Sequence, residues 1–222
     1  MKGGVIGAAV FASVILNPVA AKPSEFVAIA DIAPSIQKDI RYFGRDNFVG
    51  TTIDGYLAPK CLLHQDAAKA LAKVQKKALQ QGMTLKVFDC YRPQRAVDHF
   101  VRWVSDNSAQ DTKAHYYPNL DKGVLLGDYI AAKSGHSRGA TVDLTLVDMA
   151  SGEELDMGSA FDMFDPISNT DDPRISAQQR NNRYLLRDLM TAQGFAPYAM
   201  EWWHFSLKPQ PYPDTYFDFV VR

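Results

Sequence analysis

The feature that most constrains the fold of this chain is a carboxylate set inside an apolar strand. Residues 134–140 read Ser-Gly-His-Ser-Arg-Gly-Ala, and this glycine and serine content is typical of a loop. Residues 141–147 read Thr-Val-Asp-Leu-Thr-Leu-Val, which predicts a strand. Burying Asp143 there is costly unless a cation meets it. A metal ion is one such cation, and His136 in the loop is a second ligand of a type that suits zinc.

A third ligand is expected near the C-terminus, where residues 201–204 read Glu-Trp-Trp-His. A catalytic zinc takes three protein ligands and keeps one position for water, and a nearby base must accept the proton of that water. His136, Asp143 and His204 supply the ligands, and Glu201 supplies the base. Positions three apart on a regular strand face opposite sides. Glu201 must therefore precede the strand, or a bulge must intervene.

The remaining pattern predicts one α+β domain. Hydrophobic periodicity and end signals predict helices over 64–81, 93–105 and 176–193. Further strands are predicted over 85–88, 203–207 and 215–221, with a short one over 27–30. Apolar side chains in the acidic connection 148–175 favour an ordered segment. We therefore expect a single domain over 22–222, with a small, mainly antiparallel sheet, several helices packed on it and the zinc site at the sheet centre.

The junction between the strand at 85–88 and the helix at 93–105 carries Asp89 and Arg92, at a common position for functional side chains. Cys, Tyr and Pro flank Arg92, which indicates a partly buried guanidinium in need of an anionic partner. The aromatic and glycine-rich loop at 39–50 is equally compatible with lining a cleft and with capping the core.

The first 21 residues have the layout of a secretory signal peptide. Lys2 precedes an apolar run from Val5 to Leu16, and Val19-Ala20-Ala21 offers a cleavage site after Ala21. The run is shorter than the roughly 20 apolar residues of a membrane-spanning helix. We therefore expect export, with the periplasm as destination and no membrane anchor after cleavage. In an oxidising compartment Cys61 and Cys90 have two interpretations, a disulfide or two buried thiols.

The charge balance excludes one class of partner, because a formal net charge of −1 at pH 7 gives no electrostatic basis for binding nucleic acid. His64, His99 and His115 stand alone in the sequence, and we expect them outside the metal site. The oligomeric state is not determined by any pattern in the chain.

Five blocks, taken together and in order, resemble the zinc-dependent D-alanyl-D-alanine dipeptidases, the group that includes the vancomycin-resistance dipeptidases. The blocks extend from about residue 39 to 207, nearly the whole of the expected mature chain. They are Tyr42 with Asp-Asn-Phe-x-Gly at 46–50, Asp-x-Tyr-Arg-Pro at 89–93, Ser-Gly-His-Ser-Arg-Gly-x-x-x-Asp at 134–143, Asp-Met-Gly with Phe-Asp at 156–162, and Glu-Trp-Trp-His at 201–204.

The resemblance implies one zinc ion per chain, held by His136, Asp143 and His204, with Glu201 as catalytic base. It also implies that Arg92 stabilises the developing oxyanion and that Asp162 lies near the substrate's free ammonium. Tyr42, Asp89 and Ser134 match pocket positions or positions behind the metal ligands. The activity implied is hydrolysis of the D-Ala-D-Ala dipeptide, a small-molecule substrate, in cell-wall precursor or peptidoglycan turnover.

Two other functions are weighed against this one. A D,D-carboxypeptidase or L,D-endopeptidase of the same zinc superfamily would act on murein peptides and would need an open cleft in place of an anion for the free ammonium. A non-catalytic zinc-stabilised binding module would not need Glu201. Cobalt or manganese could occupy the same ligand set.

Overall fold

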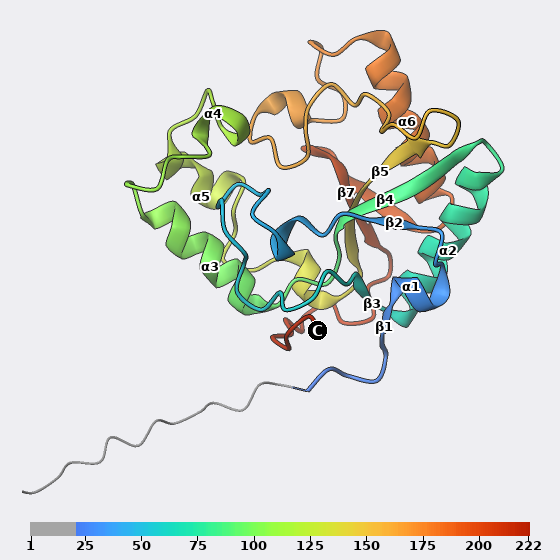
Figure 1. The fold of residues 1–222 in the computed structure, drawn as a ribbon, viewed down its shortest axis with the longest axis horizontal. Helices are drawn as coiled ribbons and strands as arrows, with labels where there is room; N and C mark the ends of the chain where they lie inside the picture. The colour runs from blue at the N-terminus through green and yellow to red at the C-terminus, as the bar shows by residue number, and fades with distance from the viewer. Residues whose placement is uncertain (1–20) are drawn as a thin grey trace, which may run out of the picture.

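The computed structural model describes residues 21–222, and the predicted signal peptide lies outside the described residues except for Ala21. Figure 1 shows the helices gathered around a central sheet. The strands are β1 Phe26–Ala28, β2 Gln37–Lys38, β3 Leu62–His64, β4 Met83–Asp89, β5 Thr141–Asp148, β6 Phe195–Tyr198 and β7 Glu201–Leu207. The α-helices are α1 Ile29–Ile32, α2 Gln65–Leu79, α3 Gln94–Ser105, α4 Lys113–Tyr116, α5 Leu125–Asp128 and α6 Ala177–Thr191. Short 3₁₀ turns are η1 Arg41–Phe43, η2 Lys122–Val124, η3 Gly135–Arg138 and η4 Pro166–Ser168.

The main sheet has the strand order β2-β4-β5-β7-β6, with only the two-residue β2 running parallel to its neighbour. A separate antiparallel pair joins β1 and β3. The predicted α+β class with a small, mainly antiparallel sheet is confirmed. β5 is the central strand, and all its residues from Thr141 to Val147 are buried. Burial on both faces explains why this strand reads as a nearly continuous apolar run.

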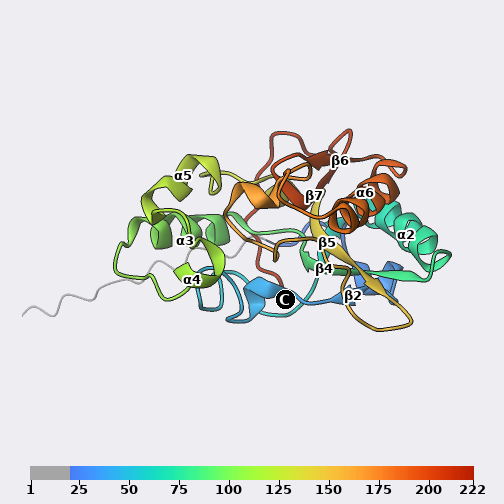
Figure 2. The same cartoon turned by 90° about the horizontal axis from the view of Figure 1, so that it is seen from above.

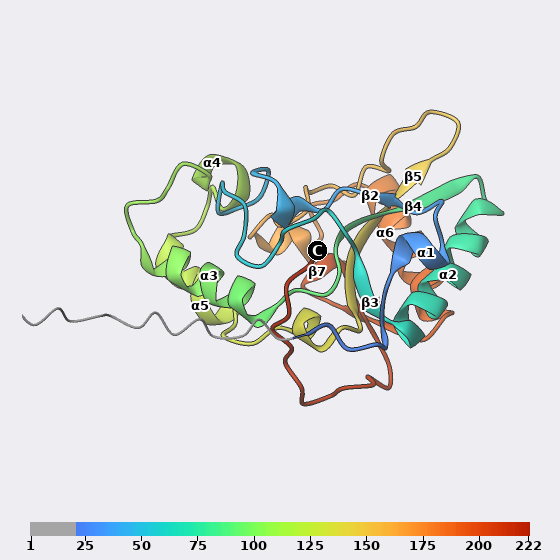
Figure 3. The same ribbon diagram turned by 60° about the horizontal axis from the view of Figure 1, so that its bottom comes forward.

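The helices lie at two ends of the molecule. In the three ribbon views α3, α4 and α5 lie on one side of the sheet strands and α2 lies on the other (Figures 1, 2 and 3). α2 contacts both β4 and α6, so these two long helices cover the sheet together. The three predicted long helices are confirmed to within two residues at each end. The predicted capping box of α6 is present, with Ser176 and Gln179 bonded reciprocally.

The α2 helix shows how its sequence selects its buried face. Its predicted apolar face, formed by Ala67, Leu71, Val74 and Ala78, is fully buried. The lysines on the opposite face are exposed. Gly82, just after the helix, has a φ of +73°. Glycine adopts this left-handed conformation without the steric strain that a Cβ atom would cause.

The prediction of a strand over 215–221 is wrong. In this segment Val221 forms an isolated bridge with Tyr56, and the rest is extended chain without a ladder. The alternating apolar residues of this segment reflect insertion into the core and not strand pairing. Phe219 and Val221 are buried there, and the Phe219 ring stacks on Tyr91 at 4.0 Å between centroids. The strand predicted over 27–30 is shorter than expected, since α1 begins at Ile29. Among the described residues no helix is both long and apolar enough to cross a membrane.

Candidate active site

Three candidate side chains form a row across the middle of the sheet. In the antiparallel register Asp143 on β5 lies opposite Asp89 on β4 and opposite His204 on β7. Side chains that are directly opposite in an antiparallel pair project from the same face. The register therefore brings Asp89, Asp143 and His204 together, although they are far apart in the sequence.

His136 reaches this row from the turn that precedes β5. Ser134 begins η3 by accepting a hydrogen bond from the His136 backbone N–H at 3.2 Å. Gly139 ends the turn with a φ of +81°, and a Cβ at this position would collide with the ring of Phe26. The tight turn leaves His136 buried beside Asp143.

The potential ligand atoms of His136, Asp143 and His204 all lie within 4.8 Å of one another. His136 Nε2 is 3.2 Å from Asp143 Oδ2, and His204 Nδ1 is 3.0 Å from Asp143 Oδ1. The two imidazole nitrogens are 3.3 Å apart. The Oδ1 atom of Asp143 is buried and accepts no hydrogen bond of good geometry. A buried carboxylate with an imidazole nitrogen close to each of its two oxygens fits a bound divalent cation.

The electrostatics hold Asp143 in the protonation state that suits a metal, whereas they act on His204 in the opposite sense. Burial alone would raise the pKa of Asp143, but the neighbouring His136 and His204 outweigh it and hold that pKa well below its usual value. Burial lowers the pKa of His204, but the adjacent Asp143 carboxylate raises it more, and the net increase favours the protonated form over the neutral form that binds metal. Asp143 is thus held as a carboxylate, the form in which it can bind a cation.

The second ring nitrogen of His136, Nδ1, has two acceptors close to it. Nδ1 lies 2.7 Å from the backbone oxygen of Cys90 and 3.3 Å from Asp89 Oδ2. Asp89 is fully buried and also accepts hydrogen bonds from Tyr56 at 2.6 Å and from Arg92 at 2.8 Å. With both neighbours of Nδ1 acting as acceptors, its proton is fixed and the Nε2 lone pair faces the candidate metal position.

Glu201 stands beside His204 because the β6–β7 hairpin is irregular. Pro197 pairs with Phe205, whereas the next residue, Tyr198, pairs with Glu201. This register break is the predicted irregularity, within a strand that includes Glu201. It brings Glu201 Oε2 to 3.5 Å from His204 Nδ1. Burial raises the pKa of Glu201, while His204 opposes this increase. A carboxylate with a raised pKa is suited to accept a proton.

Arg92 follows β4 and its guanidinium approaches the same row. Its Nε donates to Asp89 at 2.8 Å, and Nη2 lies 3.7 Å from Asp143 Oδ2. The guanidinium carbon lies over the rings of Tyr42 and Phe100, at 4.9 and 5.1 Å from their centroids. The anionic partner expected for Arg92 is therefore Asp89, and aromatic rings fix the rest of the side chain.

Asp162 comes from the long connection between β5 and α6, which is ordered as predicted. It is buried, has a φ of +60°, and accepts a hydrogen bond from Tyr42 at 2.8 Å. Positive φ in a non-glycine residue stores strain that is common at functional sites. Burial, together with the nearby charge of Asp143, raises the pKa of Asp162 well above its usual value.

Most of these side chains line one cleft of about 250 Å³. Of the predicted site residues, Tyr42, Arg92, Ser134, His136, Asp143, Asp162, Glu201 and His204 line it. Asp89 does not, and lies behind His136. The loop at 39–50 lines the cleft through Tyr42 and Phe48. His64, His99 and His115 are absent from the lining, and His64 instead caps α2.

Sequence reasoning missed Tyr56, the backbone oxygen of Cys90 and the lining residues Phe100 and Tyr198. Phe100 follows the helical periodicity of a core residue, and nothing in its spacing separates a cleft wall from a core. A backbone acceptor has no sequence signal of its own.

Three ligand-type side chains, an adjacent carboxylate base and a fixed guanidinium around one cleft define a metal-dependent hydrolase. The comparisons with known proteins specify the class further. The sequence profile of the D-ala-D-ala dipeptidase family matches residues 22–222, so the chain belongs to this family of metal-dependent peptidases.

Relatives from several bacteria carry the name D-alanyl-D-alanine dipeptidase. The chain is 44% identical to one from Streptomyces coelicolor, over 89% of this chain and 98% of the relative. It is 39% identical to one from Enterococcus faecium, with the same coverage of 89% and 98%. A protein of that name from Escherichia coli is 37% identical over 83% of this chain and 85% of the relative.

Proposed function

We propose that this chain is a zinc metallopeptidase that hydrolyses the dipeptide D-alanyl-D-alanine to two molecules of D-alanine. The observation that carries the proposal is the convergence of His136, Asp143 and His204 within 4.8 Å, with Glu201 beside them. Membership of the D-ala-D-ala dipeptidase family supports the substrate.

A zinc ion held by these three side chains would lower the pKa of water toward ~7 and polarise the scissile carbonyl. Glu201 accepts the proton of the attacking water and later donates it to the leaving amine. Arg92 faces the oxygen that gains negative charge, and a fixed donor of this kind contributes roughly 3–4 kcal/mol to transition-state stabilisation. Asp89 and the aromatic rings keep Arg92 in place for this role.

Asp162 gives the site its restriction to dipeptides. A buried acid whose pKa is raised ionises readily only when a cation binds beside it. The free ammonium of a dipeptide is such a cation, whereas the blocked nitrogen of a longer peptide is not. Tyr42 orients the carboxylate through its hydrogen bond, and Ser134 lines the same cleft.

We also propose that the protein is exported and acts in the periplasm on products of peptidoglycan turnover. Two features support this location: the signal-like sequence of residues 1–21 and the pairing of Cys61 with Cys90 in a disulfide.

The direct test is an assay of D-alanine release from D-Ala-D-Ala by the zinc-loaded protein and by its Glu201→Ala variant. We expect the variant to lose roughly 10²–10⁴-fold in rate, the usual contribution of a general base. Equal rates for the two proteins would refute the role of Glu201. A D-Ala-terminated pentapeptide serves as the second substrate, and preference for it over the dipeptide would favour the murein carboxypeptidase function instead.

A further inference from the structure

The orientation of the proposed metal ligand His136 depends on a backbone oxygen, and this oxygen lies just beyond the end of the β4–β5 ladder. Val87 pairs with Leu144 and Asp89 pairs with Asp143, with a register shift between them. Asp89 is the last β4 residue paired with β5, and the oxygen that binds His136 Nδ1 at 2.7 Å belongs to the next residue, Cys90. The β4–β5 ladder does not hold that oxygen.

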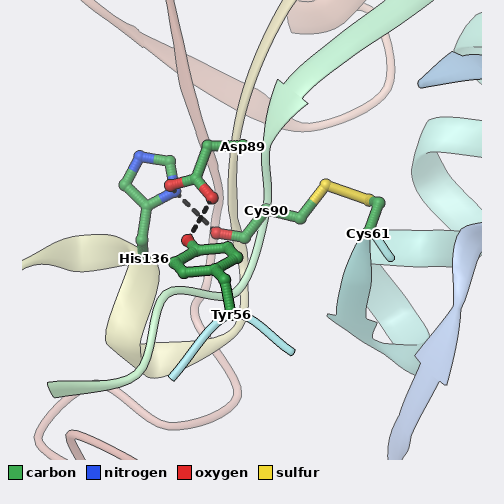
Figure 4. Close-up of a disulfide and its surroundings, with 5 residues drawn as sticks. All are labelled: Tyr56, Cys61, Asp89, Cys90 and His136. Carbon is green, nitrogen blue, oxygen red and sulfur yellow. Dashed lines mark hydrogen bonds and ion pairs between the residues drawn. A yellow bond between two sulfur atoms is a disulfide. The ribbon is translucent and has the colours of Figure 1, made fainter. Parts of the chain in front are cut away.

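Cys90 is instead held from the side opposite His136. Its sulfur is bonded to that of Cys61, the Cα atoms are 5.2 Å apart, and both cysteines are buried. Figure 4 shows the side chain of Cys90 pointing to Cys61 while its backbone oxygen points to the imidazole of His136. One residue thus links the disulfide directly to the metal ligand.

The other end of the disulfide is itself anchored. The backbone oxygen of Cys61 accepts from the Ile29 N–H at 2.9 Å, and the oxygen of Leu62 accepts from the Tyr91 N–H at 2.8 Å. These bonds tie the chain around Cys61 both to α1 and to the residue that follows Cys90. The Tyr91 N–H belongs to the same planar peptide group as the Cys90 oxygen, so this bond and the disulfide together join the end of β4 to a fixed part of the fold.

We propose that the Cys61–Cys90 disulfide is a positioning element for His136, and that it raises the metal affinity of the site beyond its effect on folding. The inference rests on the proposed metal site. With Cys90 fixed, its oxygen keeps the proton on Nδ1 and directs Nε2 toward the ligand cluster.

Asp89 is a poor substitute as acceptor for Nδ1. It lies 3.3 Å away, and its two oxygens already accept from Tyr56 and Arg92. If Cys90 moves, the imidazole must follow it or turn toward Asp89, and either change misplaces Nε2 relative to Asp143.

The test is a zinc titration against a competing chromophoric chelator, using the metal-free full chain and its Cys61→Ala/Cys90→Ala variant. Both thiols are removed so that no free sulfur competes for zinc. Loss of a partner behind a metal ligand typically costs 10–100-fold in affinity, and we expect about 10-fold here. Leu71→Ala, a buried truncation on α2 outside the cleft lining, is the control for general destabilisation, and its zinc affinity should stay within about twofold of wild type.

A second readout separates positioning from stability. In metal-free protein labelled with ¹⁵N-histidine, the Nδ1–H signal of His136 should be sharp in the wild type, and should broaden or shift in the double variant but not in Leu71→Ala. Should the double variant fail to fold, Cys61→Val/Cys90→Ala refills part of the lost volume and undergoes the same two measurements.

A zinc affinity of the double variant within about twofold of wild type would overturn the proposal, whatever the Nδ1–H signal shows, and would leave the disulfide as a stabiliser of the fold alone. Absence of zinc binding by the wild type would instead refute the proposed metal site. The two failures are therefore distinguishable.

Discussion

The proposed metal ligands and the proposed ammonium-binding carboxylate, Asp162, reach one cleft from two different kinds of structure. Asp143 and His204 are held by the β5–β7 register, and His136 by a tight turn leading into the same strand. Asp162 comes from the connection at 149–176, where the described chain pairs with the main strands only at the bridge between Val147 and Glu154.

A buried guanidinium is a main anchor of the connection, which lacks a ladder and is also bonded to other side chains of α6 and to Trp202. Arg183 on α6 donates to three backbone oxygens of the connection, those of Met157, Ile167 and Asn169, at 2.6, 2.9 and 2.6 Å. It is 1% exposed, and burial, only partly opposed by the nearby carboxylate of Asp172, lowers its pKa to about 10. The comparison teaches that the proposed metal position depends mainly on the backbone bonds of the sheet, while the proposed ammonium position depends mainly on side-chain bonds to an irregular segment. Changes in the second region should therefore alter substrate binding and leave the metal in place.

The largest effect is expected at the sheet. Asp143→Ala removes the central ligand and leaves two imidazoles facing a cavity, so zinc binding should fall below one equivalent and D-alanine release should drop at least ~10³-fold. Metal analysis and the D-alanine assay measure both. Asp148→Ala, at the far end of the same strand, is the matched control and should retain both properties. Full zinc occupancy in Asp143→Ala would contradict the assignment of this residue.

A smaller effect is expected at the connection. Asp162→Asn keeps the size of the side chain but removes its charge. This costs about 1.5–3 kcal/mol for a hydrogen bond to a charged group, or roughly 10–150-fold in kcat/KM for D-Ala-D-Ala. Zinc content should not change. N-acetyl-D-Ala-D-Ala lacks the ammonium, and we expect both proteins to hydrolyse it equally slowly. An equal loss of rate on the two substrates would show that Asp162 does not recognise the ammonium.

The smallest effect on turnover is expected at Arg183. Arg183→Met leaves three buried carbonyls without a donor, which should lower the free energy of unfolding by about 2–4 kcal/mol. Because the connection would loosen, KM for the dipeptide should rise several-fold, with zinc affinity unchanged. Chemical denaturation, steady-state kinetics and zinc titration measure the three quantities. Arg180→Met on the same helix removes one long hydrogen bond of 3.3 Å to Asp172 and should have little effect. A lost zinc site in Arg183→Met would show that the two regions are not separable.

The same contrast explains what the sequence could predict. Strand 141–148 and the long helices follow from periodicity, and Asp143 was conspicuous because a charge interrupted an apolar run. The position of Asp162 had no such signal, since an irregular connection is shaped by distant partners such as Arg183 and Tyr42. Only the resemblance to a family pointed to Asp162. The segment at 215–221 was predicted wrongly because side chains that alternate into a core look alike with or without a ladder.

The most direct test is anomalous diffraction at the zinc edge from crystals of the zinc-loaded protein. We expect one strong peak per chain, with His136 Nε2, an Asp143 oxygen and His204 Nδ1 at about 2.0–2.2 Å from it and Glu201 outside that sphere. A peak elsewhere, or one that lacks any of these three ligands, would contradict the proposal that the β5–β7 register and the turn before β5 build a single metal centre.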